Sequence, residues 1–276
     1  MIHEEHTLWM GEKTRLFAQR WVPDGRPHAV LALVHGFGEH TGRYAHVGEA
    51  LARQGYALCG VDLPGHGRTQ GGRGRTSRAE LVNAAQELLR DAKARFPDLP
   101  VFLYGHSMGG AIVLIAALTT ALDAAGVIVT SPLIRLATQT PGWKVAAARL
   151  LAGLLPSFTI PNPLEMTELT RDPGMVAAVR GDPLYHTMVS ARLGWDILQF
   201  MDVFEDQRGA FPVPLLVMQG TADRIVDAAA TIALAGRLSG KITLKTWDGL
   251  YHELHNEPEK EAVMEYIVSW MRRISA

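Results

Sequence analysis

Short apolar runs alternate with helical patterns along most of the chain. The runs cover residues 29–34, 56–61, 101–104, 126–130, 215–218 and 242–247. Runs that are apolar at consecutive positions are typical of strands buried on both faces of a parallel sheet. Residues 78–96 and 108–122 have helical patterns, and a last helix is expected from about Pro258 to Arg273. This alternation predicts a doubly wound α/β fold with a mostly parallel central sheet flanked by helices.

Two segments depart from the alternation. Near the N-terminus, Leu16, Ala18 and Val22 alternate with other residues and predict an antiparallel hairpin at the edge of the sheet. Between about residues 134 and 211 no strand is expected. We therefore predict a core made of residues 1–133 and 212–276, and a helical cap of residues 134–211 inserted after the sixth strand.

The most apolar part of the predicted cap is residues 143–155, with the sequence WKVAAARLLAGLL. As a helix it would be apolar on nearly all sides. At about 13 residues it is too short to span a bilayer. Three interpretations are open for it: it lines an apolar substrate channel, it packs in the interior, or it contacts a membrane surface.

Composition and charge exclude several classes of protein. The 27 Lys and Arg residues among 276 are balanced by 28 Asp and Glu, so there is no electrostatic case for a nucleic-acid partner. The single cysteine, Cys59, excludes an internal disulfide and a cysteine-based zinc site. No run of about 18 uncharged apolar residues occurs, and acidic residues interrupt the N-terminus before a signal peptide could form. We expect a cytoplasmic protein.

A nucleophile motif follows the third apolar run directly. Gly105-His106-Ser107-Met108-Gly109 has the G-x-S-x-G pattern, and it stands between a predicted strand and a predicted helix, as this motif requires. In such a sharp turn the serine occupies the apex, and side chains at the flanking glycines would collide. We predict that Ser107 is a nucleophile. The alternative is a glycine-rich turn with an idle serine.

A serine hydroxyl needs a base, and in this architecture the order along the chain is serine, acid, histidine. Asp223 lies just past the fifth apolar run, and His252 lies in the loop before the last helix. The competitors fit less well: Asp248 is expected to form a turn, Asp227 to cap a helix, and His255 to lie too near the helix start. The order and the loops favour Asp223 and His252.

Acyl transfer places negative charge on the carbonyl oxygen, which N–H donors can stabilise. One donor is expected to be the N–H after the nucleophile, that of Met108. The second should come from the loop after the first central strand, which reads His-Gly-Phe-Gly-Glu-His at 35–40. The glycines of this loop let its amides turn inward, and we select the N–H of Phe37.

With these residues in place, the chain resembles the monoacylglycerol lipase family of α/β-hydrolases along nearly its whole length. The matching segments are residues 35–40 with Arg43 and Tyr44, and residues 62–68, 105–110, 220–224 and 251–257. The resemblance implies the same triad and oxyanion donors. It also implies that Glu39, Arg43 and His255 bind the glycerol end of the substrate. From the residues alone, Glu39 and Arg43 could instead form a local ion pair, and His255 could cap the last helix.

The combined hypothesis is a serine hydrolase that cleaves monoacylglycerols through an acyl-enzyme, without a cofactor. Eleven histidines are present, but no H-E-x-x-H pair or comparable cluster indicates a metal site. The alternatives are a lysophospholipase, a broad carboxylesterase, a peptidase, or a ligand receptor that keeps the fold without catalysis. Besides a lipid ester, the partners left open are a membrane surface, in transient contact with the cap at a peripheral location, and a second copy of the chain as a homo-oligomer.

Overall fold

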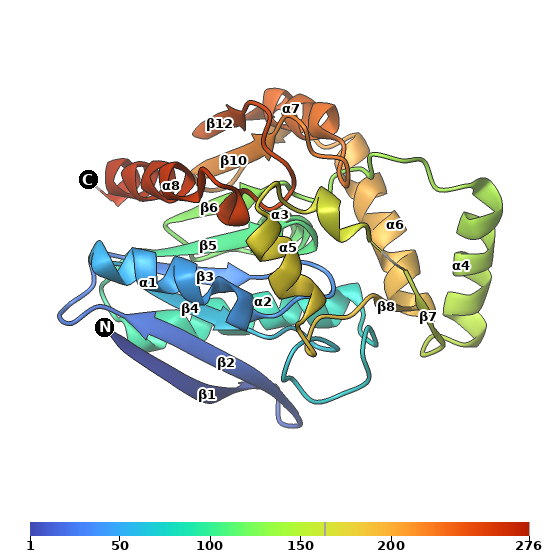
Figure 1. Ribbon diagram of the computed structural model, residues 1–276, viewed down its shortest axis with the longest axis horizontal. Helices are drawn as coiled ribbons and strands as arrows, with labels where there is room; N and C mark the ends of the chain where they lie inside the picture. The colour runs from blue at the N-terminus through green and yellow to red at the C-terminus, as the bar shows by residue number, and fades with distance from the viewer. Residues whose placement is uncertain (163, 276) are drawn as a thin grey trace.

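An eight-stranded sheet runs through the middle of the computed structural model, which describes residues 1–162 and 164–275 (Figure 1). The strand order is β1-β2-β4-β3-β5-β6-β10-β12. The edge strands β1 and β2 pair antiparallel, β2 is antiparallel to β4, and the strands from β4 to β12 are parallel. Their bounds are Ile2–Met10 (β1), Thr14–Val22 (β2), Val30–Val34 (β3), Ala57–Val61 (β4), Val101–His106 (β5), Gly126–Thr130 (β6), Leu215–Gly220 (β10) and Ile242–Trp247 (β12).

Helices cover both faces of the sheet (Figure 1). Successive side chains of a strand point to opposite faces, so Val127 and Val129 of β6 enter one apolar core and Ile128 enters the other. The first core also contains buried side chains of four helices, and the second contains those of two. The first group is α2 (Arg78–Arg95), α3 (Met108–Thr119), α6 (Ala191–Glu205) and α7 (Ala228–Arg237), and the second is α1 (Ala45–Arg53) and α8 (Lys260–Ser275). The predicted fold class is confirmed.

The predicted helices form close to their expected ends. Helix α2 begins at Arg78 because Ser77 caps it: the Ser77 hydroxyl accepts a hydrogen bond from Glu80 N–H at 3.4 Å. Helix α3 ends at Thr119, earlier than expected, because Thr120 is already extended. The N-terminal hairpin forms as predicted, with Leu16 paired to Leu8.

The segment between β6 and β10 contains three helices and short strands. Helix α6 attaches to the first core through Phe200 and Phe204, which are fully buried. Strands β7 and β8 pair antiparallel where no strand was predicted, since three residues are too few to show a period. The bounds are Gly142–Leu154 (α4), Thr159–Pro161 (β7), Pro173–Arg180 (α5), Met188–Ser190 (β8), Ala191–Glu205 (α6) and Gly209–Ala210 (β9), with a 3-10 turn at Met166–Glu168 (η2). Strand β9 pairs with β11 (Leu238–Ser239), which lies outside this segment. Two further 3-10 turns elsewhere in the chain are Thr41–Tyr44 (η1) and Leu254–Asn256 (η3).

Helix α4 lies apart from the sheet, at one end of the molecule (Figure 1). None of its described residues is buried, and the exposed fractions of Trp143 and Leu154 are 71% and 69%. The interpretation that this segment packs in the interior is therefore wrong. Within the described part of the chain, every helix is too short or too polar to cross a membrane.

Candidate active site

Ser107 forms the whole turn between β5 and α3. The strand ends at His106 and the helix begins at Met108, so one residue must reverse the chain. Its backbone has φ 52° and ψ −118°, a conformation that costs a non-glycine residue about 1–3 kcal/mol. The Ser107 N–H donates to the carbonyl of Thr130 on the neighbouring strand β6 at 3.0 Å, which holds the turn in place.

The two glycines of the motif are required by close backbone contacts. A Cβ atom at Gly105 would collide with the Gly109 carbonyl, across the turn. A Cβ at Gly109 would collide with the carbonyls of Val34 and His35, at the end of β3. The helix can therefore start directly against the loop that follows β3.

The structure brings Ser107, His252 and Asp223 into one hydrogen-bonded chain. His252 Nε2 lies 2.8 Å from Ser107 Oγ, and His252 Nδ1 lies 2.8 Å from Asp223 Oδ2. A carboxylate can only accept here, so Nδ1 carries the proton and Nε2 is free to accept the serine proton. Burial disfavours the imidazolium, but the charge and hydrogen bond of Asp223 outweigh it and raise the pKa of His252.

The loop after β10 holds Asp223 in position. Its Oδ1 accepts hydrogen bonds from the N–H groups of Ile225 and Val226, at 2.9 and 3.0 Å. Gln219 Nε2 donates to Oδ2 at 3.1 Å. Burial opposes ionisation, but His252 and the two N–H donors outweigh it and lower the pKa of Asp223.

The loop after β3 lies against the nucleophile. A Cβ at Gly36 would lie 3.2 Å from Ser107 Cβ. Among residues 1–162 and 164–275, neither Phe37 N–H nor Met108 N–H donates to a protein acceptor. Two such N–H groups near a nucleophile can donate hydrogen bonds to a developing oxyanion. The loop is tied to the inserted segment, because His186 N–H donates to the Gly38 carbonyl at 2.9 Å.

Three buried charged side chains form a cluster next to the triad, and we call it the Glu39–Arg43–Glu253 cluster. Arg43 Nη1 donates to Glu39 Oε2 and Glu253 Oε1, and Nη2 donates to Glu253 Oε2, all at 2.8 Å. Burial raises the pKa of Glu39, despite Arg43 nearby. Burial also disfavours the Glu253 carboxylate, but the charge and hydrogen bonds of Arg43 outweigh it and lower the Glu253 pKa.

A small cavity of about 20 Å³ adjoins Ser107, with room for about one water molecule. Among the residues predicted to bind glycerol, Glu39 lines this cavity, whereas Arg43 and His255 do not. Arg43 is held behind the carboxylates. The lining residues are Gly36, Phe37, Glu39, His106, Ser107, Leu164, Leu169, Tyr185, His252 and Glu253.

His255 lies in a layer behind the cavity. Its ring stacks on Tyr44 with 4.5 Å between centroids and meets the edge of His106 at 4.8 Å. Burial lowers the pKa of His255 well below the ordinary value and that of His106 to about 3, so both rings are neutral. The structure thus places His255 next to His106 and not against the cavity.

Sequence reasoning missed Glu253 and Tyr185 as lining residues. Glu253 follows His252 directly, so its place beside the base could have been inferred from the same motif. Tyr185 comes from the inserted segment, and its ring lies 5.8 Å from the Arg43 guanidinium carbon. Nothing in its local sequence indicates that it reaches the site.

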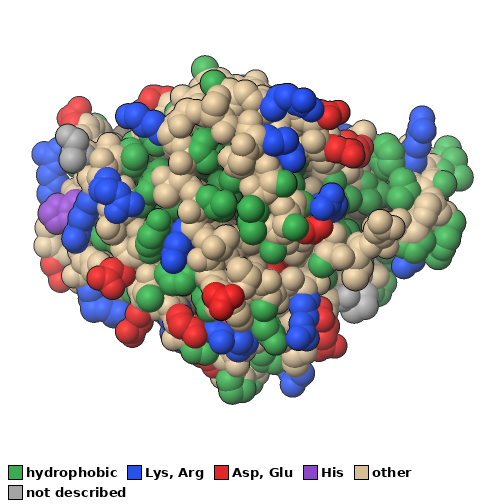
Figure 2. Space-filling view, turned by 90° about the horizontal axis from the view of Figure 1, so that it is seen from above, with side chains coloured by type: hydrophobic (Ala, Val, Ile, Leu, Met, Phe, Trp, Pro, Cys, Tyr) green, Lys and Arg blue, Asp and Glu red, His purple; other side chains and the backbone are tan. Residues whose placement is uncertain are grey.

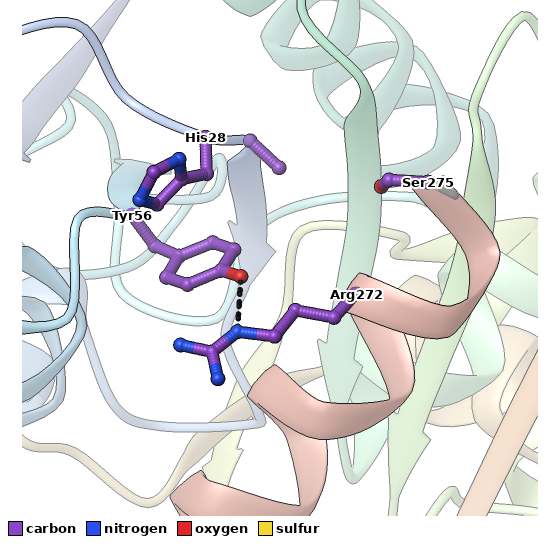
Figure 3. A pocket seen from close by; sticks show the side chains of 5 residues that line it. His28, Tyr56, Arg272 and Ser275 are labelled. Atoms are coloured by element: carbon purple, nitrogen blue, oxygen red, sulfur yellow. Dashed lines mark hydrogen bonds between the residues drawn. The ribbon is translucent and has the colours of Figure 1, made fainter.

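A larger cavity, of about 350 Å³, lies at the amino ends of strands β3 and β4 (Figure 3). His28 and Tyr56 precede strands β3 and β4, and Arg272 and Ser275 come from the end of α8. Arg272 Nε donates to the Tyr56 hydroxyl at 3.0 Å, and the five lining residues include no carboxylate. Elsewhere in the described residues, no three His, Cys, Asp or Glu side chains are grouped as a metal site would require.

Comparison with known proteins agrees with this geometry. The family model of the serine aminopeptidases, S33, matches residues 25–259. The chain belongs to this S33 family. It is 32% identical over 270 residues to a monoacylglycerol lipase of Mycolicibacterium smegmatis, covering 97% of this chain and 96% of that one. It is also 35% identical over 254 residues to a phospholipase of Bacillus subtilis, covering 89% of this chain and 95% of that one.

A solved structure also supports the assignment of this chain to the S33 family. The monoacylglycerol lipase of Paleococcus ferrophilus superposes with a TM-score of 0.83 at 31% identity, covering 94% of this chain and 99% of that one. A longer relative also exists: the chain spans 28% of an uncharacterized abhydrolase domain-containing protein of Dictyostelium discoideum, to which it is 35% identical. The fold of this S33 member is that of the α/β-hydrolases.

Proposed function

We propose that this protein hydrolyses monoacylglycerols to a free fatty acid and glycerol. The observation that carries the proposal is the hydrogen-bonded chain from Asp223 through His252 to Ser107, at a strained turn. A serine hydroxyl becomes a useful nucleophile only when a base removes its proton, and this arrangement supplies one.

In the proposed reaction, Ser107 Oγ attacks the ester carbonyl carbon while His252 Nε2 takes the hydroxyl proton. Asp223 keeps the proton on Nδ1 and stabilises the imidazolium. The N–H groups of Phe37 and Met108 bind the carbonyl oxygen as it becomes negative. His252 then protonates the leaving glycerol oxygen. Water, deprotonated by the same imidazole, attacks the acyl-enzyme and releases the fatty acid.

Two observations support glycerol as the alcohol. The relatives from Mycolicibacterium smegmatis and Paleococcus ferrophilus are both named for monoacylglycerol. Glu39 lines the cavity, and a carboxylate accepts hydrogen bonds from hydroxyl groups. In this proposal Glu39 contacts the glycerol, whereas Arg43 acts through Glu39, and His255 acts through His106, from one layer behind.

Residues 134–211 act as a cap in this proposal. A cavity of about 20 Å³ cannot hold an acyl chain, so Leu164, Leu169 and Tyr185 must move to admit one. The exposed apolar side chains around α4 suit contact with a membrane surface that holds the substrate, and Lys144 and Arg149 add positive charge. Figure 2 shows hydrophobic side chains gathered at the protruding end of the molecule, with cationic side chains beside them. The apolar residues are Trp143, Leu150, Leu154, Leu155, Phe158 and Ile160.

The second candidate is a lysophospholipase, which the Bacillus subtilis relative favours. It would use the same triad, and the difference would lie in the alcohol that the site accepts. Fatty-acid release from a matched set of substrates distinguishes the two. The set contains monoacylglycerols of short to long chain, di- and triacylglycerols, lysophosphatidylcholine and p-nitrophenyl esters.

The proposal predicts the highest kcat/KM for monoacylglycerols and no fatty-acid release by Ser107→Ala above background. A preference for lysophosphatidylcholine would favour the second candidate. Equal rates on all simple esters would indicate a broad carboxylesterase. Labelling of Ser107 by an active-site phosphonate without turnover of any substrate would point to a receptor.

A further inference from the structure

The cavity beside Ser107 is lined by two acidic side chains, but the cation between them is turned away from it. Glu39 and Glu253 are lining residues, and Arg43 is not. Both terminal nitrogens of the Arg43 guanidinium are engaged: Nη1 by both carboxylates and Nη2 by Glu253, at 2.8 Å in each case. A molecule in the cavity therefore meets the carboxylates and not the guanidinium.

With both carboxylates ionised, the cluster carries one more negative charge than positive. Its oxygens are surrounded by donors, as ionised carboxylates require: Glu39 Oε1 accepts from Gly36 N–H at 2.5 Å and from the Tyr44 hydroxyl at 2.9 Å. Glu253 Oε2 accepts from Asn256 Nδ2 at 2.7 Å. Screening by salt is weak for buried charges, so the excess negative charge acts on whatever enters the cavity.

The alcohol half of the ester must lie against this cluster. In the proposed reaction His252 gives its proton to the leaving oxygen, so that oxygen lies next to the imidazole. Glu253 is the next residue in the chain, and Glu39 accepts from the N–H of Gly36, which lies against Ser107. The substituents of the alcohol therefore lie near both carboxylates.

Neutral and anionic alcohols would interact differently with this cluster. A glycerol hydroxyl can donate a hydrogen bond to a carboxylate. An ionised phosphate can only accept, and it would be repelled by the excess negative charge. The cation that would bind a phosphate best, Arg43, is already held by Glu253 through two parallel hydrogen bonds.

We propose that Glu253 determines specificity by excluding anionic headgroups: it occupies Arg43, so the alcohol side of the site accepts hydroxyl groups and rejects phosphate. The inference rests on the proposed function, because it takes an acylglycerol as the substrate. It deepens that function, since it separates neutral monoacylglycerols from phosphate-bearing lysophospholipids.

The test compares two substrates that differ only by the phosphate, 1-octanoylglycerol and 1-octanoylglycerol 3-phosphate. We expect the wild-type protein to favour the neutral ester by about 100-fold or more in kcat/KM. Glu253→Gln keeps the shape of the side chain but removes the charge and one of the two acceptor oxygens that hold Arg43. It should raise the kcat/KM ratio of phosphate to neutral ester by about tenfold or more, which corresponds to about 1.4 kcal/mol.

Glu39→Gln is the second variant, because it removes the other carboxylate of the cluster and should shift the same ratio in the same direction. The control is Glu265→Gln, which removes one negative charge from the exposed side of α8 and should leave the ratio unchanged. A urea denaturation midpoint close to that of the wild type shows that each variant is folded.

Two results would overturn the inference while leaving the proposed function intact. One is a wild-type protein that hydrolyses both octanoyl esters with similar kcat/KM. The other is a folded Glu253→Gln protein whose ratio equals that of the wild type. Failure of the wild type to hydrolyse 1-octanoylglycerol at all is a different result, and it would overturn the proposed function itself.

Discussion

The sheet core and the α4 region of the inserted segment place apolar side chains in opposite environments. Every residue of β3, β4, β5 and β6 is buried. In α4 none of the described residues is buried, although the helix is almost as apolar. The two regions differ in how firmly their side chains are held. The reacting groups lie next to the densely packed sheet core, whereas the segment that we propose admits the substrate includes a helix with no buried residue.

One stretch of the inserted segment is held to the core by hydrogen bonds. Asp182 Oδ2 lies 2.7 Å from His40 Nε2, and His186 bonds to the Gly38 carbonyl. Both contacts reach the loop that carries Phe37. The position of one proposed oxyanion donor therefore depends on residues from outside the sheet, whereas α4 makes no hydrogen bond to this loop in the described part of the chain.

The largest expected effect is that of removing the nucleophile from the core. Ser107→Ala should lower kcat by about 10⁴-fold or more, because only binding and the oxyanion donors remain. The measurement is octanoate release from 1-octanoylglycerol. The denaturation midpoint should stay close to that of the wild type, which separates loss of chemistry from loss of fold. Appreciable turnover by a purified Ser107→Ala protein would contradict the assignment of the nucleophile.

A matched pair of glycine substitutions contrasts the two regions in stability. Gly109→Ala would force a Cβ into the carbonyls of Val34 and His35, and we expect it to destabilise the fold by about 3 kcal/mol. Gly153→Ala, in α4, meets no atom within 4 Å and should be neutral or stabilise by up to about 1 kcal/mol. Urea denaturation measures both. Equal free energies of unfolding for the two variants would refute the contrast.

The pH dependence tests the electrostatics of the core. Catalysis needs the neutral imidazole, and Asp223 raises the pKa of His252 above its ordinary 6.5. The pH at which kcat/KM falls to half its maximum on the acid side should therefore lie above 6.5. At lower pH, kcat/KM should fall tenfold for each pH unit. In stability the sign is opposite: the contribution of His252 is fully present below pH 6.5 and is lost as pH rises through its raised pKa.

Asp223→Asn provides the control for that profile. It removes the charge that raises the His252 pKa, so the acid limb of the residual activity should move to lower pH. A limb at the same pH in both proteins would show that another group titrates.

The smallest expected effect concerns the exposed face around α4. Trp143→Ser with Leu154→Ser should weaken binding to phospholipid vesicles, and lower activity on vesicle-borne monoacylglycerol by about fivefold. Activity on dissolved 1-octanoylglycerol should hardly change. Leu244→Ser on β12, which is 38% exposed, is the matched control and should affect neither. Unchanged vesicle binding by the double variant would contradict the proposed membrane contact.

The sequence was most informative where chemistry and backbone geometry constrain one another. The G-x-S-x-G pattern located the turn of Ser107, because the glycines on either side have no room for a side chain. Apolar runs located the six parallel strands, because five of them are buried on both faces, whereas the edge strand β12 is only partly buried. The order serine, acid, histidine that this architecture uses, together with the loops that follow two apolar runs, selected Asp223 and His252.

Sequence reasoning was weaker where the outcome depends on tertiary partners. Arg43 was expected at the substrate, but Glu253, 210 residues later, holds it behind the cavity. His255 was expected there too, and it stacks on Tyr44 instead. The exposure of α4 could not be read from its composition, because an apolar helix is compatible with burial and with a membrane surface.

The central claim is that Ser107 carries the acyl group of a monoacylglycerol during turnover. Rapid acid quenching of the wild-type protein with 1-octanoylglycerol, followed by peptide mass spectrometry, tests it most directly. We expect one octanoyl group on the peptide that contains Ser107, formed and lost at rates consistent with turnover, and absent in Ser107→Ala. An octanoyl group on another residue, or turnover with no acylated peptide and no effect of Ser107→Ala, would contradict it.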